Sequence, residues 1–295
     1  MIIHLKGGLG NQLFQLAFAH AIYEKTGMRQ FIYVPQIYRT DHDARKFLDI
    51  CNHLKELPRF LNLLLDFVLR INLFSQLLSR MRIVKYEHDL DINSVEMDFS
   101  KSGPLSRLHL FSGYWQDWKI VASADQIFST ELQIFLEAHI GLPAGTESSG
   151  QIVIHIRRGD LLLQHNRELY GVVPLSSYRK VMNELEISFP NLQLVTLTDS
   201  PIEVASEGSR DDFGLILGPD LCDPWQALKV MKNATVVISA NSTLSWWGAF
   251  LAVQIGAIVY VPTPWYANFP TEASEKKMFP EFRQYDANYQ KEGGC

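Results

Sequence analysis

The second half of the chain alternates short apolar runs with segments of helical periodicity, and this alternation limits the fold more than any other feature. Apolar runs at 152–156, 193–197, 235–239 and 257–261 are separated by helical segments at 175–189, 224–233 and 244–254. Strands that alternate with helices pair in parallel, because each crossover packs a helix on a face of the sheet. The pattern predicts a parallel sheet covered by helices on both faces.

The first half follows the same order less regularly. We expect a strand at 2–6, a tight turn at 7–10 and a helix at 12–26 that ends at Gly27. A strand at 31–34 follows, then a mostly helical stretch at 40–100, a strand at 108–114 and a helical run from about 118 to 140. Residues 141–150 are rich in breakers and read as a linker. The sequence thus predicts an α/β protein of two Rossmann-like lobes facing a cleft, with domains 1–145 and 146–295.

Composition narrows the class of protein. The 295 residues are 47% hydrophobic and 20% charged, with a net charge of −5, which argues against broad nucleic-acid binding. Cys51, Cys222 and Cys295 form neither a metal motif nor a disulfide framework, which fits a reducing compartment. The first residues show no secretory signal pattern, so we expect a cytoplasmic protein.

Residues 59–82 are leucine-rich, but Asp66 and several arginines make them a poor transmembrane span. Two interpretations stay open for this stretch. It forms either a pair of helices packed on the core, or a helix that lies on the inner membrane surface as a peripheral contact.

Residues 151–160, QIVIHIRRGD, place charged side chains directly after a buried-looking strand. The guanidinium groups of Arg157 and Arg158 match phosphate oxygens, and open α/β sheets bind ligands at strand carboxyl ends. His155 should share a face with Arg157, two residues on. This segment alone leaves two possibilities, an anion site or an interdomain salt bridge with Asp160.

Two further turns have the composition of ligand-binding loops. Residues 7–12, GGLGNQ, open a helix, but Leu13 stands where a dinucleotide fingerprint needs glycine. Asn11, Gln12 and the helix N-terminus still suit a polar or anionic ligand, although a simple chain reversal is the alternative. Residues 238–249 carry Asn241 and Ser242 at the start of a helix, where they either cap it or bind a pyrophosphate.

Asp199 also ends a strand, either as a turn residue or as a carboxylate that accepts from the N1–H and N2–H₂ of guanine. Metal ligands are not indicated. The strings Asp41-His42-Asp43 and Asp89-Leu90-Asp91 match D-x-D by chance, and the histidines show no metalloprotease spacing.

Taken together, these segments resemble the bacterial α-1,2-fucosyltransferases of glycosyltransferase family 11. The matching segments, in order, are GGLGNQLFQLAFA near the N-terminus, GYWQ at 113–116, HIRRGD at 155–160, TDS at 198–200, ISANSTLSWW at 238–247 and VPTPWY at 261–266. Leu161, Ser200 and the ISANS string depart from the family pattern.

The resemblance implies a GT-B-like fold and transfer of fucose, with inversion, from GDP-fucose to the 2-hydroxyl of a galactose-terminated glycan. No metal or other cofactor is expected. A related enzyme of different linkage, such as α-1,6, and a non-catalytic glycan- or sugar-nucleotide-binding protein are the alternatives.

The resemblance also suggests roles for the singled-out residues. Asn11 would contact phosphate or fucose, Asn241 and Ser242 the phosphates, and His155 and Asp199 the guanosine. Arg157 would neutralise the leaving phosphate, and Arg158 would make a second phosphate contact or hold Asp160. Asp160 is the general base or a buttress for the arginines. In the first half of the chain, two roles stay open for a set of aromatic side chains, stacking on the acceptor sugar or packing in the core. These are Tyr33, Tyr38, Tyr114, Trp115 and Trp118.

Overall fold

The computed structural model describes residues 1–71, 83–86, 109–147, 150–186, 188–207 and 210–289. The chain divides into two units, 1–135 and 136–295. This division falls inside helix α6 (Asp125–His139), whereas the predicted boundary at 145/146 lies beyond the end of that helix.

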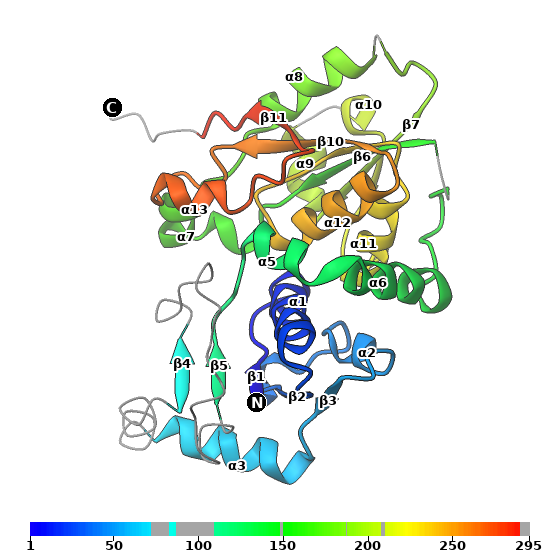
Figure 1. Cartoon of the computed structure of the whole chain (residues 1–295). Helices are drawn as coiled ribbons and strands as arrows, with labels where there is room; N and C mark the ends of the chain where they lie inside the picture. Colours follow the sequence, from blue (N-terminus) through cyan, green and yellow to red (C-terminus); the bar gives the residue numbers. More distant parts are fainter. Residues whose placement is uncertain (72–82, 87–108, 148–149, 187, 208–209, 290–295) are drawn as a thin grey trace. The chain divides into compact units, whose positions relative to one another are not determined.

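The first unit is built on a five-stranded parallel sheet in the order β3-β2-β1-β5-β4 (Figure 1). Its strands are β1 (Ile2–His4), β2 (Gln30–Tyr33), β3 (Leu54–Glu56), β4 (Val84–Tyr86) and β5 (Leu110–Ser112). Its helices are α1 (Leu9–Thr26), the 3-10 turn η1 (Gln36–Tyr38), α2 (Arg45–Leu48), α3 (Arg59–Arg70), α5 (Trp118–Ser123) and most of α6.

Helix α1 ends where the sequence predicts. Gly27 adopts a left-handed conformation with φ 65°, and its N–H donates to the Tyr23 carbonyl at 2.7 Å. Glycine adopts this conformation without the steric cost that a Cβ would bring. The predicted helix stop is confirmed.

The second unit holds a six-stranded parallel sheet in the order β11-β10-β9-β6-β7-β8. The strands are β6 (Gln151–Ile156), β7 (Gln193–Thr198), β8 (Leu215–Leu217), β9 (Val236–Ile238), β10 (Ile258–Thr263) and β11 (Arg283–Asp286). The helical elements are η6 (Gly159–Leu162), α7 (Gln164–Tyr170), α8 (Leu175–Glu186), α9 (Pro201–Glu207), α10 (Arg210–Phe213), α11 (Pro224–Lys232), α12 (Thr243–Gln254) and α13 (Thr271–Glu275).

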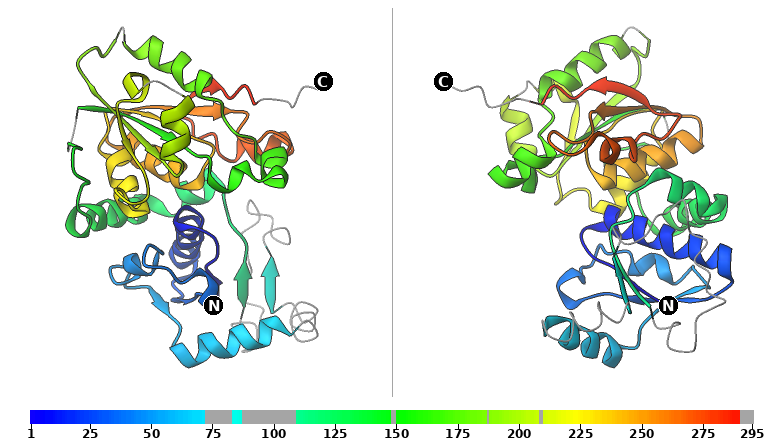
Figure 2. Two further views of the ribbon diagram at one scale, coloured as in Figure 1. Left: turned by 180° about the vertical axis from the view of Figure 1, so that it is seen from behind. Right: turned by 60° about the vertical axis from the view of Figure 1, so that its left-hand side comes forward.

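Helices cover both faces of this sheet, as the two views in Figure 2 show. Ile152, Ile154 and Ile156 of β6 point to one face, where they pack in a core with residues of α8 and with Val204 of α9. Helices α11 and α12 pack on each other, and α12 contacts β9 and β10. The predicted α/β class with two parallel-sheet lobes is confirmed, while a cleft between the lobes stays a prediction.

Four short strands were not predicted, namely β3, β4, β8 and β11. Each lies at the edge of its sheet. An edge strand pairs with one neighbour only, and the backbone groups on its other side stay unpaired. The expectation of a mostly helical stretch at 40–100 is wrong for β3 and β4, and residues 72–82 and 87–108 lie outside the described part of the chain. Among the described residues, no helix combines the length and apolar character needed to cross a lipid bilayer.

Candidate functional site

The site is set by the strand order of the second sheet. Strands β6, β7 and β8 run outward in one direction, and β9, β10 and β11 run outward in the other. The order therefore reverses between the neighbours β6 and β9, and open α/β sheets bind ligands outside the carboxyl ends of strands at such a reversal. The segments after these two strands are the HIRRGD and ISANS motifs.

The loop after β6 is held by the carboxylate that ends β7. Asp199 Oδ1 accepts from the backbone N–H of Arg158 at 2.7 Å. A Cβ on Gly159, whose φ is +26°, would lie 2.4 Å from Asp199 Oδ2, so only glycine permits this approach. Asp199 is thus a positioning group for the loop, and its predicted contact with guanine stays a prediction.

The two adjacent arginines have different partners. Arg157 forms an ion pair with Asp160, and its Nε lies 4.0 Å from Asp199 Oδ2. Arg158 extends to α9, where it donates to Glu207 at 3.0 Å. The alternative in which Arg158 holds Asp160 is wrong, because the Asp160 carboxylate pairs with Arg157 and the Arg158 guanidinium pairs with Glu207. The Arg157–Asp160 pair is local rather than interdomain.

His155 lies in β6, two residues before Arg157. Its side chain is on the face of the sheet opposite Ile154 and Ile156, because side chains alternate along a strand. Burial, with a smaller effect from the nearby Arg157, lowers the pKa of His155 to about 3. The imidazole is therefore neutral at physiological pH, and its buried Nδ1 has no hydrogen-bond partner.

The segment after β9 carries two more buried polar atoms without a partner, Asn241 Oδ1 and Ser242 Oγ. The Asn241 amide nitrogen donates to the carbonyls of Tyr170 and Gly171 at 2.9 and 3.1 Å. Its expected donation to a phosphate is thus not available in this arrangement, and only its carbonyl oxygen faces the site unused. We name His155, Arg157, Asn241 and Ser242 the switch-point cluster.

Ser242 occupies the position before α12 but makes no side-chain cap. The first N–H groups of a helix have no partner within it and carry the positive end of the helix dipole. Because the Ser242 hydroxyl is buried and unused, the capping interpretation of this residue is wrong. Helix α12 is 12 residues long and begins after β9, the neighbour of the strand that precedes Arg157. Its N-terminus is suited to binding an anion.

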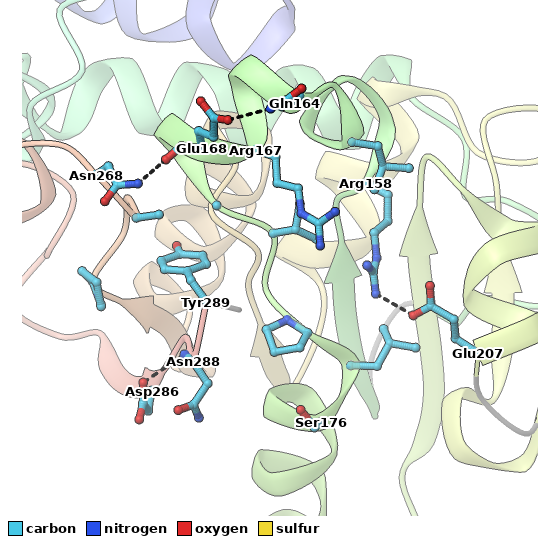
Figure 3. Close-up of a pocket in the computed structure, with 17 residues that line it drawn as sticks. Arg158, Gln164, Arg167, Glu168, Ser176, Glu207, Asn268, Asp286, Asn288 and Tyr289 are labelled. Atoms are coloured by element: carbon cyan, nitrogen blue, oxygen red, sulfur yellow. Dashed lines mark hydrogen bonds and ion pairs between the residues drawn. The ribbon is translucent and has the colours of Figure 1, made fainter. Parts of the chain in front are cut away.

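Figure 3 shows a pocket of about 740 Å³ in this unit. No residue of the cluster lines it, but the Asn241 amide donates to the carbonyl of Gly171, which does. Arg158 lines the pocket together with polar residues of several elements. Of the residues predicted to bind the GDP-sugar, only Arg158 is in the lining. Gly171 and Tyr289 both line the pocket, and they pack so closely that a Cβ on Gly171 would lie 2.4 Å from the Tyr289 ring. The other lining residues drawn with labels are Gln164, Arg167, Glu168, Ser176, Glu207, Asn268, Asp286 and Asn288.

The first unit has its own reversal of strand order, between β1 and β5. Asn11, after β1, accepts from Gln116 Nε2 at 2.7 Å, which joins the two strand ends. A Cβ on Gly7 would lie 2.5 Å from Asn11 Nδ2, so the glycine turn lets Asn11 fold back over it. The structure thus places Asn11 at this edge of its own sheet.

Two glutamines explain the rest of the first motif. The sequence interpretation missed Gln15, and Gln12, which was expected to face a ligand, is buried and paired with protein atoms. Gln12 donates to the Gly7 carbonyl at 2.9 Å and accepts from Ala44 N at 2.8 Å. Gln15 accepts from Lys6 N at 2.9 Å and donates to the Gly113 carbonyl at 3.0 Å. Their position on the buried side of an apolar helix was the available signal, since buried amides need partners.

The aromatic residues expected near the acceptor fall into two groups. Tyr33 and Trp115 are core residues, 2% and 0% exposed, so the core-packing alternative is confirmed for both. Tyr114 is exposed, with Lys6 Nζ 4.6 Å from its ring centroid, and Tyr38 and Trp118 are half-buried.

Neither D-x-D string forms a metal site that the structure describes. Asp43 is buried and accepts from Thr40 N and from Arg45, while Asp89 and Asp91 lie outside the described residues. No group of three or more metal-ligating side chains occurs in the described ranges.

A family model described as glycosyl transferase family 11 matches residues 1–282 of this chain. The chain belongs to glycosyl transferase family 11. The resemblance of its motifs to this family is confirmed, and the protein is therefore a glycosyltransferase.

Two curated relatives of this family 11 protein come from Escherichia coli. An alpha-1,2-colitosyltransferase is 27% identical over 285 residues, covering 90% of this chain and 92% of the relative. The O-antigen biosynthesis glycosyltransferase WbnK is 26% identical over 303 residues, covering 89% and 94%.

Among solved structures, the chain is similar to POFUT1 in complex with GDP, with a TM-score of 0.46, 11% identity, and 85% and 94% of the two chains covered. It is also similar to the NodZ α-1,6-fucosyltransferase co-crystallised with GDP, with a TM-score of 0.45, 13% identity, and 85% and 91% covered. The family assignment rests on the sequence match alone.

Proposed function

We propose that this family 11 glycosyltransferase moves L-fucose from GDP-β-L-fucose to the 2-hydroxyl of a terminal galactose in a glycan, with inversion and without a divalent metal. The observation that carries the proposal is the switch-point cluster. His155 Nδ1, Asn241 Oδ1 and Ser242 Oγ are buried without partners around the strand end that carries Arg157. Buried polar atoms without partners are rare in folded proteins, and a bound polar ligand explains them.

Charge develops on the β-phosphate of the nucleotide as the bond to the sugar breaks. Arg157 supplies a permanent positive charge, and the N-terminus of α12 supplies N–H groups aimed beyond the strand ends. Fixed donors of this kind stabilise a developing anion without reorganising during the reaction, and one such donor is typically worth ~3 kcal/mol. Arg157, the Ser242 hydroxyl and the N-terminus of α12 therefore suit activation of a GDP leaving group. The unused Asn241 oxygen can only accept, so it suits a hydroxyl or N–H of the ligand rather than a phosphate oxygen.

The acceptor hydroxyl loses its proton as the new glycosidic bond forms. Asp160 is the candidate base of this proposal, and its alternative role is to orient Arg157. The ion pair between Asp160 and Arg157 supports the orienting role. A transition state in which the sugar–phosphate bond is nearly broken needs little help from a base. The variant Asp160→Asn separates the base role from the orienting role, because only the loss of a base changes the dependence of kcat on pH.

A second donor deserves the same assay because one relative is named an alpha-1,2-colitosyltransferase. Colitose is fucose without its 3-hydroxyl. A site that hydrogen-bonds this hydroxyl rejects the deoxy sugar strongly, whereas an apolar site there accepts it. The assay with both donors therefore decides which sugar the enzyme transfers.

The free cysteines support a reducing, cytoplasmic setting for the proposed enzyme. Cys51 and Cys222 are buried thiols, and burial raises the pKa of Cys222 to about 12.

The test incubates the protein with GDP-fucose or GDP-colitose and a β-galactoside disaccharide, with and without EDTA. We expect GDP release with GDP-fucose, an α-1,2 linkage by NMR and no effect of EDTA. Release only with GDP-colitose reassigns the donor sugar, and an α-1,6 product reassigns the linkage. Absence of GDP release with every β-galactoside overturns the proposal, and loss of activity in EDTA overturns its metal-independent part.

A further inference from the structure

Helix α3 is apolar on two opposite faces. Its inner face packs on the first sheet, where Leu61, Leu65 and Leu69 lie against Tyr33, Val84 and Leu110. Its outer face presents four large apolar side chains to water at the i, i+3, i+4, i+7 spacing of one helical stripe. These are Phe60, Leu63, Leu64 and Phe67, which are 69%, 55%, 55% and 65% exposed.

The charges of α3 are arranged around this stripe. Asp66, its one acidic residue, is turned toward the sheet, where it accepts from the Tyr33 hydroxyl at 2.5 Å and from Gln36 N at 3.3 Å. Arg59 and Arg70 are exposed at the two ends of the helix. On a helical wheel with 100° per residue, both arginines lie beside Leu63, at one border of the outer stripe.

Isolated exposed apolar side chains are ordinary, but a continuous stripe of two phenylalanines and two leucines has a cost in water. A stripe with two arginines along one border matches a bilayer surface, because the apolar side chains enter the head-group boundary while the guanidinium groups contact lipid phosphate. We propose that the outer face of α3 binds an anionic membrane surface. The sequence left a packed helix and a membrane-surface helix open for 59–82, and residues 59–70 form a helix suited to both.

This proposal is independent of the proposed function, since a soluble disaccharide assay needs no membrane. The test measures flotation of the whole protein with vesicles of phosphatidylglycerol and phosphatidylethanolamine, and with phosphatidylcholine vesicles as the neutral surface. The main variant combines Phe60→Gln, Leu63→Gln, Leu64→Gln and Phe67→Gln, because glutamine preserves helix propensity. The matched control combines Ile202→Gln and Leu221→Gln, which replace apolar residues of similar exposure, 84% and 63%, in the other unit.

We expect the wild type and the control to float with anionic vesicles and the main variant to partition at least ~10-fold less. Arg59→Gln with Arg70→Gln should reduce binding to anionic vesicles toward the level seen with phosphatidylcholine, as should high salt. The melting temperature of the main variant should be unchanged or higher, since its substitutions face water.

Three results overturn the proposal. The first is no flotation of the wild type with anionic vesicles. The second is a lower melting temperature of the main variant, which means that another part of this chain covers the stripe. The third is a wild-type dimer in light scattering that becomes a monomer in the main variant, which assigns the stripe to a second copy.

Discussion

Asp199 fixes the position of Arg158 through the main chain, with the Arg158 N–H donating to Asp199 Oδ1 at 2.7 Å. The carboxylate ends β7 and the arginine follows β6, so one hydrogen bond joins the ends of two neighbouring strands. The side chain of Arg158 takes no part in this contact. The loop is therefore positioned independently of which side chain stands at position 158.

The first prediction concerns Arg157. Arg157→Ala should lower kcat for sugar transfer by about 100-fold or more, because it removes the fixed cation that we propose stabilises the leaving phosphate. Arg157→Lys should recover only part of this loss, since an ammonium group cannot form the bidentate contact. Steady-state kinetics with GDP release as readout checks both variants. Near-normal turnover of Arg157→Ala would assign leaving-group stabilisation to another residue.

The second prediction concerns Gly159. Gly159→Ala should lower kcat by about 10-fold and reduce stability by ~1–3 kcal/mol, because its Cβ meets Asp199 Oδ2 at 2.4 Å and displaces the loop. Gly141→Ala is the matched control, as its Cβ would meet no atom within 4 Å. Chemical denaturation and kinetics measure both effects. Equal behaviour of the two variants would show that the loop tolerates displacement.

The third prediction separates stability from binding at Ser242. Ser242→Ala removes a buried hydroxyl that has no protein partner, so the melting temperature should not fall. If the hydroxyl contacts a phosphate, the dissociation constant for GDP should rise by about 10-fold, a typical loss for one hydrogen bond to a charged group. Thermal unfolding and isothermal titration calorimetry test the two parts. A lower melting temperature with unchanged GDP binding would make Ser242 a structural residue.

The fourth prediction concerns pH. His155 has its pKa lowered to about 3 by burial, below the value of 6.5 that it takes in the unfolded chain. The unfolded state therefore binds a proton that the folded state refuses, and stability falls as pH drops below about 6.5. The expected slope from His155 is on the order of 1 kcal/mol per pH unit, and His4 and His53, with pKa values lowered to about 4, add to it.

Urea denaturation at several values between pH ~7 and pH ~5 measures this slope. His155→Gln keeps a polar side chain of similar length without a titrating group, so its stability should depend less on pH than that of the wild type. An unchanged slope in this variant would show that His155 takes up its proton in the folded state.

Much of the fold was predictable because apolar runs and helical periodicity are local signals. The apolar runs of the second half coincide with β6, β7, β9 and β10. Gly27 marks the end of α1 because glycine readily adopts the left-handed conformation found there. Strand β11 was not predictable in the same way. Its residues Arg283, Gln284 and Asp286 are exposed, and it pairs only because β10 offers an open edge.

The residues of the site were easier to find than their partners. The sequence located Arg157, Arg158 and Asn241 at strand ends, but their partners come from elsewhere in the chain. Arg158 meets Glu207 across 49 positions, and the Asn241 amide meets the Tyr170 carbonyl across 71. No local pattern encodes such distant pairings, so the direction of each side chain required the structure.

Arg157 and the N-terminus of α12 bear on how fast the proposed enzyme would turn over, because both favour negative charge. A site that favours the fully charged phosphate of free GDP over the ester in the donor also retains the product after transfer. GDP should then be a strong competitive inhibitor, and its departure rather than bond cleavage would limit the steady-state rate.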